Sequence, residues 1–130
     1  MKNAWTSKRP TKPASGITYL ASPYSHPSRE VVAGRYVRAC DAAGRLMVKG
    51  YVVFSPIAHS HSIERQMGRV NTGDFWHTQD EPILRLCSRL VVLMLDGWRE
   101  SRGIAWEIEV AKEMGIPIEY MEIDSISRTV

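Results

Sequence analysis

The sequence predicts a small, doubly wound α/β fold in which helices cover both faces of a mainly parallel sheet. Short runs of aliphatic and β-branched residues alternate along the chain with helical periodicities. One run, RLVVLML at 89–95, is almost entirely apolar, and a strand that is apolar on both faces belongs in a parallel sheet covered on both sides. A length of 130 residues with 44% hydrophobic content suits one domain with a modest core.

The first half of this domain contains two predicted strands with a long helix between them. ITYLA at 17–21 is rich in strand formers and ends in the Ser/Pro loop SPYSHPS. Along 29–49, apolar residues recur every three or four positions until Gly50, which predicts a helix packed on one face. YVVFSP at 51–56 is a second strand. We expect 57–68 to begin as a loop and continue as a short helix.

The second half repeats this alternation. DFWHTQDEPILRLCS at 74–88 is expected to be helical in its later part, with Pro82 in the first turn. After the strand at 89–95, SRGIAWEIEVAKEMGIP at 101–117 predicts an amphipathic helix closed by Gly115, and IPIEYMEI contains the last strand. The order of elements is typical of flavodoxin-like and Rossmann-like sheets.

The basic charge of the chain is concentrated near its start. The net charge is +3, but 4 of the 17 basic residues precede residue 17 in a stretch without acids, leaving 13 basic against 14 acidic residues. The Pro, Ser and Lys content of 1–16 predicts a disordered tail, followed by a single domain at 17–130. We therefore do not expect a nucleic-acid partner, and anchoring of the tail to nucleic acid is the weaker alternative.

The sequence contains no membrane or cofactor signature. It has no apolar run of ~18 residues and no signal-peptide core, so we expect a cytoplasmic protein without a membrane partner. Cys40 and Cys87 lack a CxxC partner and are interpreted as buried thiols. His59 and His61 form an H-x-H pair without a third ligand at a recognisable spacing. Hydrogen bonding to substrate or water is favoured over a metal site there.

Glu107 lies within the apolar arc of its predicted helix. The arc is otherwise made by Ile104, Ile108, Val110, Ala111 and Met114. A carboxylate facing a core costs several kcal/mol unless it is paired, protonated or next to a cavity. We expect Glu107 to face a pocket, with a structural role beside a neighbouring Arg or Tyr as the alternative.

Three polar segments follow predicted strands, at 19–25, 55–61 and 96–103. Ligands of parallel sheets bind at the carboxyl ends of the strands, so these segments and Glu107 are expected to converge there. The first segment would hold a sugar or phosphate, with Arg29 or Arg102 as a cation. Further candidates are the indoles of Trp98 and Trp106, which would stack on a base, although a subunit contact is an equal alternative for Trp106.

ITYLASPYS together with SRGIAWE resembles the nucleoside 2-deoxyribosyltransferase superfamily, over most of 17–121. Members begin with a strand carrying Tyr-Leu-Ala-(Gly or Ser)-Pro and later have a Gly-x-x-x-Glu helix start. The resemblance implies that Glu107 is the nucleophile that attacks the anomeric carbon and that Tyr19 orients it. It also implies a homodimer or larger homo-oligomer whose second subunit completes the site.

The stretch from HTQDE to GIAWE is similar to the 2'-deoxynucleoside 5'-phosphate N-hydrolases of that superfamily. This similarity implies that Asp80 is an active-site aspartate and that Ser101 binds a 5'-phosphate. Two residues depart from the pattern, because Ala105 replaces a glycine and Ser88 replaces an aspartate. The loop DGWRES is also longer than usual, which leaves the alignment of Asp96 open.

Breaking an N-glycosidic bond needs a carboxylate beneath the anomeric carbon and a second acid that protonates the departing base. Glu107 supplies the first, and Asp80 or Asp96 the second. A DG turn explains Asp96 equally well, and a helix start is the alternative for Asp80. We predict a deoxynucleoside or deoxynucleoside 5'-monophosphate transferase or hydrolase, with Ser101 favouring the monophosphate. The alternative is a catalytically inactive nucleotide-binding or sensing domain. The expected catalytic residues are Glu107, Tyr19, Asp80 and Asp96, and the expected substrate-binding residues are Ser22, Pro23, Tyr24, Ser25, His59, His61, Ser101 and Gly103.

Overall fold

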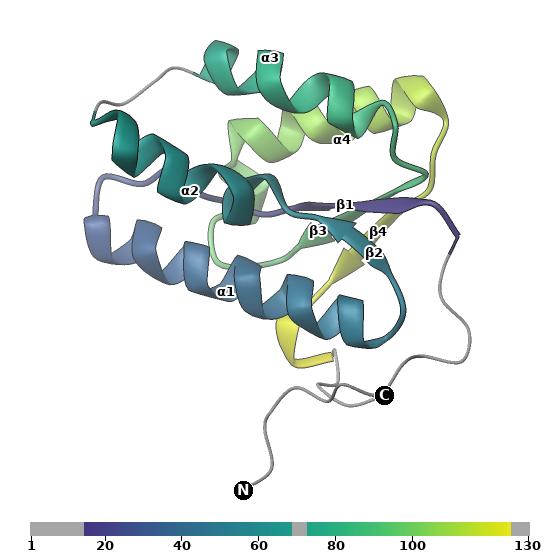
Figure 1. Ribbon diagram of the computed structural model, residues 1–130, viewed down its shortest axis with the longest axis horizontal. Helices are drawn as coiled ribbons and strands as arrows, with labels where there is room; N and C mark the ends of the chain where they lie inside the picture. Colours follow the sequence, from purple (N-terminus) through teal and green to yellow (C-terminus); the bar gives the residue numbers. More distant parts are fainter. Residues whose placement is uncertain (1–14, 69–72, 126–130) are drawn as a thin grey trace, which may run out of the picture.

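The computed structural model describes residues 15–68 and 73–125 and contains a four-stranded parallel sheet (Figure 1). The strands are β1 (Ile17–Ala21), β2 (Val52–Phe54), β3 (Arg89–Leu93) and β4 (Ile118–Met121). Their order in the sheet is β2-β1-β3-β4. The strand order therefore reverses between β1 and β3, which is the position where ligands bind in such sheets. The predicted small α/β fold with a parallel sheet is confirmed.

Four α-helices cover the sheet, namely α1 (Arg29–Val48), α2 (Pro56–Met67), α3 (Gly73–Leu84) and α4 (Arg102–Met114). Figure 1 shows α1 on one side of the sheet and α3 and α4 on the other. Alternate side chains of β1 and β3 point to opposite faces of the sheet and form two cores. Leu20 and Val91 pack against α1, whereas Tyr19 and Leu90 pack against α3 and α4. Helices on both faces explain why these strands are apolar on both sides.

The strand register aligns the carboxyl ends of the strands. Ala21 of β1 pairs with Val92 of β3, and Leu93 pairs with Met121 of β4. The loop after β1, the junction after β2 and the loop after β3 therefore leave the sheet at one edge. A short 3-10 helix, η1 (Trp98–Glu100), lies in the last of these loops, and a second, η2 (Ile123–Ser125), follows β4.

Two helices begin earlier than the sequence analysis predicted. The segment expected to start as a loop is helical from Pro56, because the Ser55 hydroxyl accepts a hydrogen bond from the Ala58 N–H at 3.1 Å and proline suits the first turn. Helix α3 begins at Gly73, so Pro82 lies inside the helix and not in its first turn. Because Pro82 has no N–H, it cannot donate to the carbonyl of Thr78 four residues earlier in the helix.

The remaining expectations concern the ends of the chain, membranes and thiols. Of the predicted tail 1–16, residues 1–14 lie outside the described residues. Gly16 (φ +76°) enters β1 so close to Ser88 that a side chain would clash with the Ser88 hydroxyl. No helix in the described ranges is long and apolar enough to span a membrane. Both thiols are free, with Cys87 buried as predicted and Cys40 only half-buried.

Candidate active site

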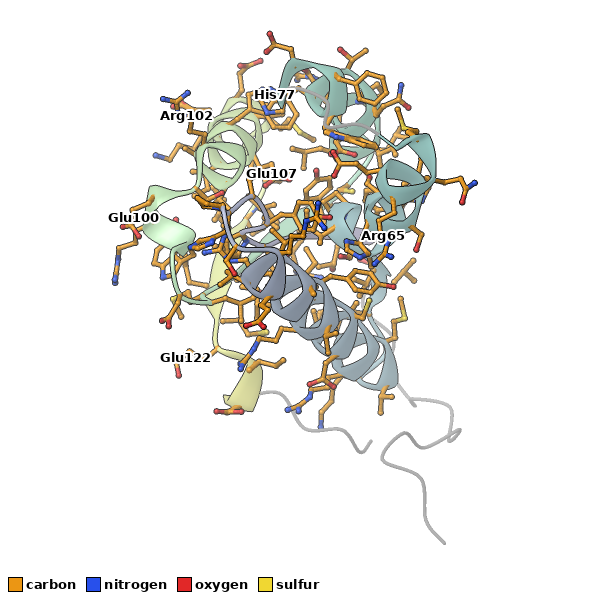
Figure 2. The ribbon with its side chains drawn as sticks, turned by 90° about the vertical axis from the view of Figure 1, so that its left-hand side faces the viewer. Arg65, His77, Glu100, Arg102, Glu107 and Glu122 are labelled. Atoms are coloured by element: carbon orange, nitrogen blue, oxygen red, sulfur yellow. The ribbon has the colours of Figure 1, made fainter. Side chains whose placement is uncertain are left out.

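A pocket of about 1460 Å³ opens at the carboxyl edge of the sheet, which Figure 2 views from the front. Its lining comes from the loops after β1 and β3 and from α1, α2, α3 and α4. The three polar segments that follow the predicted strands thus meet around one cavity. Most of the predicted site residues line this pocket, namely Ser22, Tyr24, Ser25, His61, Asp80, Asp96, Ser101, Gly103 and Glu107.

Glu107 is buried on α4 and faces the pocket. It is only 7% exposed, and in Figure 2 it points toward the other helices, whereas Arg102 and Glu100 point outward. The pKa of the Glu107 carboxyl is raised to about 8, because the rise caused by burial, with a smaller one from the charge of Asp80, exceeds the lowering by the Tyr19 hydroxyl. Neither Glu107 nor Asp80 forms a salt bridge with any described residue. Among the described residues, the arginine partner of the structural alternative is therefore absent, whereas a tyrosine is present, because the Tyr19 hydroxyl lies near enough to lower the Glu107 pKa.

Asp80 on α3 supplies a second buried carboxyl in the same pocket. It is 9% exposed, and burial raises its pKa to about 6. With pKa values of about 8 and about 6, the pair of carboxyls holds close to one proton at neutral pH. One carboxyl can then act as a base or nucleophile while the other acts as an acid.

Tyr19 lies beneath the two carboxyls, on β1. Its side chain is fully buried and does not line the pocket, and its ring packs against Phe54 at 5.7 Å between centroids. The hydroxyl is near enough to Glu107 for each group to shift the pKa of the other, but no described residue gives it a regular hydrogen bond. Burial and the charge of Glu107 raise the Tyr19 pKa, so the phenol stays protonated.

The third predicted acid, Asp96, is placed differently. Its side chain is exposed at the pocket rim, and its backbone carbonyl accepts a hydrogen bond from Arg35 at 2.9 Å. The same guanidinium donates to the Ser25 carbonyl at 2.8 Å. Arg35, which the sequence analysis missed, thus joins the loops after β1 and β3. Gly97 (φ +89°) lies beside it in the left-handed region that favours glycine, and a side chain there would displace the end of the Arg35 side chain.

The wall formed by α2 and the β1–α1 loop contains a histidine between two tyrosines. The Tyr24 hydroxyl lies 2.6 Å from His61 Nδ1, and the Tyr36 ring stacks on His61 at 4.0 Å and 16°. Ser60 also lines the pocket, and its hydroxyl and that of Ser22 are buried without a partner among the described residues. The sequence analysis missed Ser60 and Tyr36. The Ser55-Pro56 helix start was the available signal, because helical spacing from there places Ser60 on the face of His61.

Four other candidates can now be placed. His59 is exposed and lies near the Phe54 ring, 5.6 Å between centroids, and is not part of the pocket lining. Pro23 is fully buried outside the pocket lining. The Ser101 hydroxyl lines the pocket but caps α4 by accepting from the Ile104 N–H at 3.1 Å. Arg29 is exposed and outside the lining.

The two candidate tryptophans also differ. Trp106 lines the pocket and stacks on His77, with 3.9 Å between the ring centroids and an interplanar angle of 6°. Trp98 instead packs against Tyr120 and is not in the lining. Within the described ranges, no three His, Cys, Asp or Glu residues gather into a possible metal site. The H-x-H pair does not converge, since only His61 reaches the pocket.

Residues 16–123 match the family described as Domain of unknown function (DUF1937). The match covers most of the chain and the whole sheet, so the chain belongs to this family. No curated protein compared with the sequence matches it.

Proposed function

We propose that this member of the DUF1937 family cleaves or transfers the N-glycosidic bond of a deoxynucleoside or a deoxynucleoside 5'-monophosphate. The observation that carries the proposal is the pair of buried carboxyls, Glu107 and Asp80, in one pocket with raised pKa values of about 8 and about 6. Two carboxyl groups with one proton between them suit this chemistry. The resemblance to the nucleoside 2-deoxyribosyltransferase superfamily, carried by Tyr19 and Glu107 and, for its N-hydrolase members, by Asp80, adds support. It also leads us to propose a homodimer or larger homo-oligomer, and we propose a cytoplasmic location.

In the proposed reaction, the Glu107 carboxylate attacks the anomeric carbon and forms an ester with the sugar. The bond from that carbon to the base nitrogen breaks, and the proton of Asp80 passes to the departing base. Water or a second base then attacks the anomeric carbon and releases the Glu107 carboxylate. The proton lost by this second nucleophile returns to Asp80, so the enzyme ends as it began.

The reactive arrangement requires the shared proton to lie on Asp80. In the free protein the higher pKa belongs to Glu107, at about 8, so binding of the substrate must move the proton toward Asp80. Tyr19 favours this arrangement because its hydroxyl lowers the Glu107 pKa. Ser22 offers a buried, unpartnered hydroxyl to the sugar, and Trp106 offers an aromatic surface to the base.

The test is release of free base from the four common 2'-deoxynucleosides and their 5'-monophosphates, with and without a second base. We expect the native chain to turn over at least one of them and Glu107→Gln to lower the rate by at least ~10³-fold, since no nucleophile remains. Glu109→Gln is the matched control, because Glu109 is an exposed acid on the same helix. Full activity of Glu107→Gln would refute the mechanism. Thermal stabilisation by nucleotides without any turnover would favour the inactive binding domain.

The covalent intermediate gives an independent readout. A 2-fluoro-2-deoxy-arabinosyl nucleoside of the accepted base should leave its sugar on the protein, because fluorine disfavours the oxocarbenium-like transition state of the second step. Peptide mass spectrometry should place the adduct on Glu107. An adduct on Asp80 or Asp96 would reverse the proposed roles, and inversion at the anomeric carbon would mean that water attacks directly.

A further inference from the structure

We propose that His61 donates a hydrogen bond from Nε2–H to an uncharged oxygen of the substrate, and that Tyr24 is the positioning residue that selects this tautomer. The inference rests on the proposed function for the class of substrate, a nucleoside or nucleotide. It assigns a specificity role to the wall formed by α2 and the β1–α1 loop, and it separates His61 from His59, which does not line the pocket.

The Tyr24–His61 distance favours the Tyr24 hydroxyl as the donor. The Tyr24 oxygen lies 2.6 Å from His61 Nδ1, which is shorter than the usual ~2.9 Å of N–H donors and matches an O–H donor. Burial raises the Tyr24 pKa, so the phenol keeps its proton at neutral pH. With Nδ1 accepting from the phenol, the single ring proton of a neutral His61 must lie on Nε2.

The groups around His61 keep its ring neutral and fixed. Burial and the charge of Arg65 lower the His61 pKa, and Glu64 opposes this shift less strongly. Both charged residues come from α2 itself, while α1 contributes the uncharged Tyr36 ring, stacked at 4.0 Å and 16°. The Tyr24 ring meets His61 edge-on at 5.7 Å and 87°. Hence Tyr36 covers one face of the imidazole, and Tyr24 contacts its edge and sets its tautomer.

His61 has a second ring nitrogen that is available to a ligand. His61 lines the cavity, and within the described part of the chain only its Nδ1 forms a hydrogen bond. Ser60, beside it on α2, and Ser22, on the loop after β1, add buried hydroxyls without partners. Buried donors of this kind cost free energy unless a ligand or water satisfies them. Because all three groups are uncharged, none of them supplies a counter-charge to a phosphate, and we assign them to sugar hydroxyls or a base carbonyl.

The first experiment reads the tautomer directly, without a substrate. Long-range ¹H–¹⁵N NMR of the full chain at neutral pH should show His61 Nδ1 as unprotonated and Nε2 as protonated. Tyr24→Phe should mix the two tautomers, whereas Tyr120→Phe, which removes an exposed phenol on β4, should not. A protonated Nδ1 in the native chain would overturn the proposal.

The second experiment asks what the donor binds. Titration with each of the four deoxynucleosides, with their free bases and with 2-deoxyribose should shift Nε2–H, and the last two arms separate base from sugar as the acceptor. A shift of the Trp106 indole without any shift at Nε2 would overturn the donor role and leave the proposed function standing. If His61 has the expected tautomer but the chain neither binds nor turns over any of these compounds, the proposed function is refuted. The substrate class named in this inference is then refuted with it.

Variants of His61 give the functional readout. A glutamine places its amide N–H near the position of Nε2, whereas an asparagine reaches only the position of Nδ1. His61→Gln should therefore keep KM for the accepted deoxynucleoside within about threefold, while His61→Asn should raise it about tenfold, equal to ~1.4 kcal/mol. Gln66→Asn, an exposed change on the same helix, controls for folding. Equal KM values for the two His61 variants, with native melting curves, would overturn the proposal.

Discussion

The two walls of the pocket bury titratable groups in opposite ways. On the wall of α3 and α4, burial leaves Asp80 and Glu107 without a cation among the described residues, and their pKa values rise to about 6 and about 8. On the wall of α2, burial lowers the pKa of His61, but Tyr24 bonds to one ring nitrogen and Tyr36 covers one ring face. The carboxyls on the wall of α3 and α4 can therefore exchange a proton near neutral pH. On the wall of α2, His61 keeps its ring proton on one nitrogen.

The comparison shows that burial can make one side chain reactive and another specific for a ligand. A buried acid without a counter-charge has a pKa close to neutral, so it can gain and lose a proton during a reaction. A buried histidine with a phenol at Nδ1 keeps one neutral tautomer and presents one donor. The helices bring both types of group to one cavity, so the chemistry and the reading of the substrate can occur on opposite sides.

The largest expected effect separates Asp80 from Asp96 as the acid of the reactive wall. Asp80→Asn should lower kcat by ~10²–10⁴-fold on deoxynucleosides whose base must be protonated to leave. Asp96→Asn should change kcat by less than about tenfold, because its exposed side chain lacks the burial that tunes Asp80. With 7-methyl-2'-deoxyguanosine, whose base leaves without protonation, the Asp80→Asn defect should shrink. A larger defect in Asp96→Asn would exchange the two roles.

The next largest effect is on the pH dependence of folding stability, and it has opposite signs for Glu107 and His61. Folding raises the Glu107 pKa from 4.5 to about 8, so the folded state binds more protons in this window and stability falls as the pH rises through it. Folding lowers the His61 pKa, so that residue destabilises the fold as the pH falls below its ordinary value of 6.5. As the pH rises from 5 to 8, the free energy of unfolding of Glu107→Gln should therefore increase by on the order of 3 kcal/mol relative to that of the native chain.

Urea unfolding at several pH values measures this difference directly. The corresponding relative shift in Tm is about 10 °C for a domain of this size. Glu109→Gln should follow the native chain at every pH, since Glu109 is exposed. A pH dependence in Glu107→Gln equal to that of the native chain would show that Glu107 is not a buried, protonated acid.

The smallest effect concerns the link between Tyr19 and the nucleophile. The Tyr19 hydroxyl lowers the Glu107 pKa, so Tyr19→Phe should raise that pKa and reduce the ionised fraction at neutral pH. The acidic limb of the kcat/KM profile should then move to higher pH, with a loss of about tenfold at pH 7 that diminishes at higher pH. A uniform loss at every pH would indicate a packing defect instead, and the melting temperature would reveal it.

Local patterns along the chain were sufficient for much of the fold. β1 (Ile17–Ala21) matches its predicted range, α1 (Arg29–Val48) ends one residue before its predicted limit, and α4 closes at Gly115 as predicted. The same periodicity placed Glu107 on the buried face of α4. These features depend on residues a few positions apart, and their spacing encodes which face of an element is buried.

What lies opposite a buried face was decided by the tertiary structure. Asp80 and Asp96 were equivalent by sequence, and only the packing of α3 against α4 buries Asp80 near Glu107. The contacts of His61 with Tyr24 and Tyr36, and the bridge from Arg35 to two loops, join residues on different elements. Spacing along one element carries no information about such neighbours, because burial and charge at a site depend on the side chains that other elements bring to it. The sequence alone therefore determined where a carboxylate would be buried, and the fold determined which groups share its pocket and set its pKa.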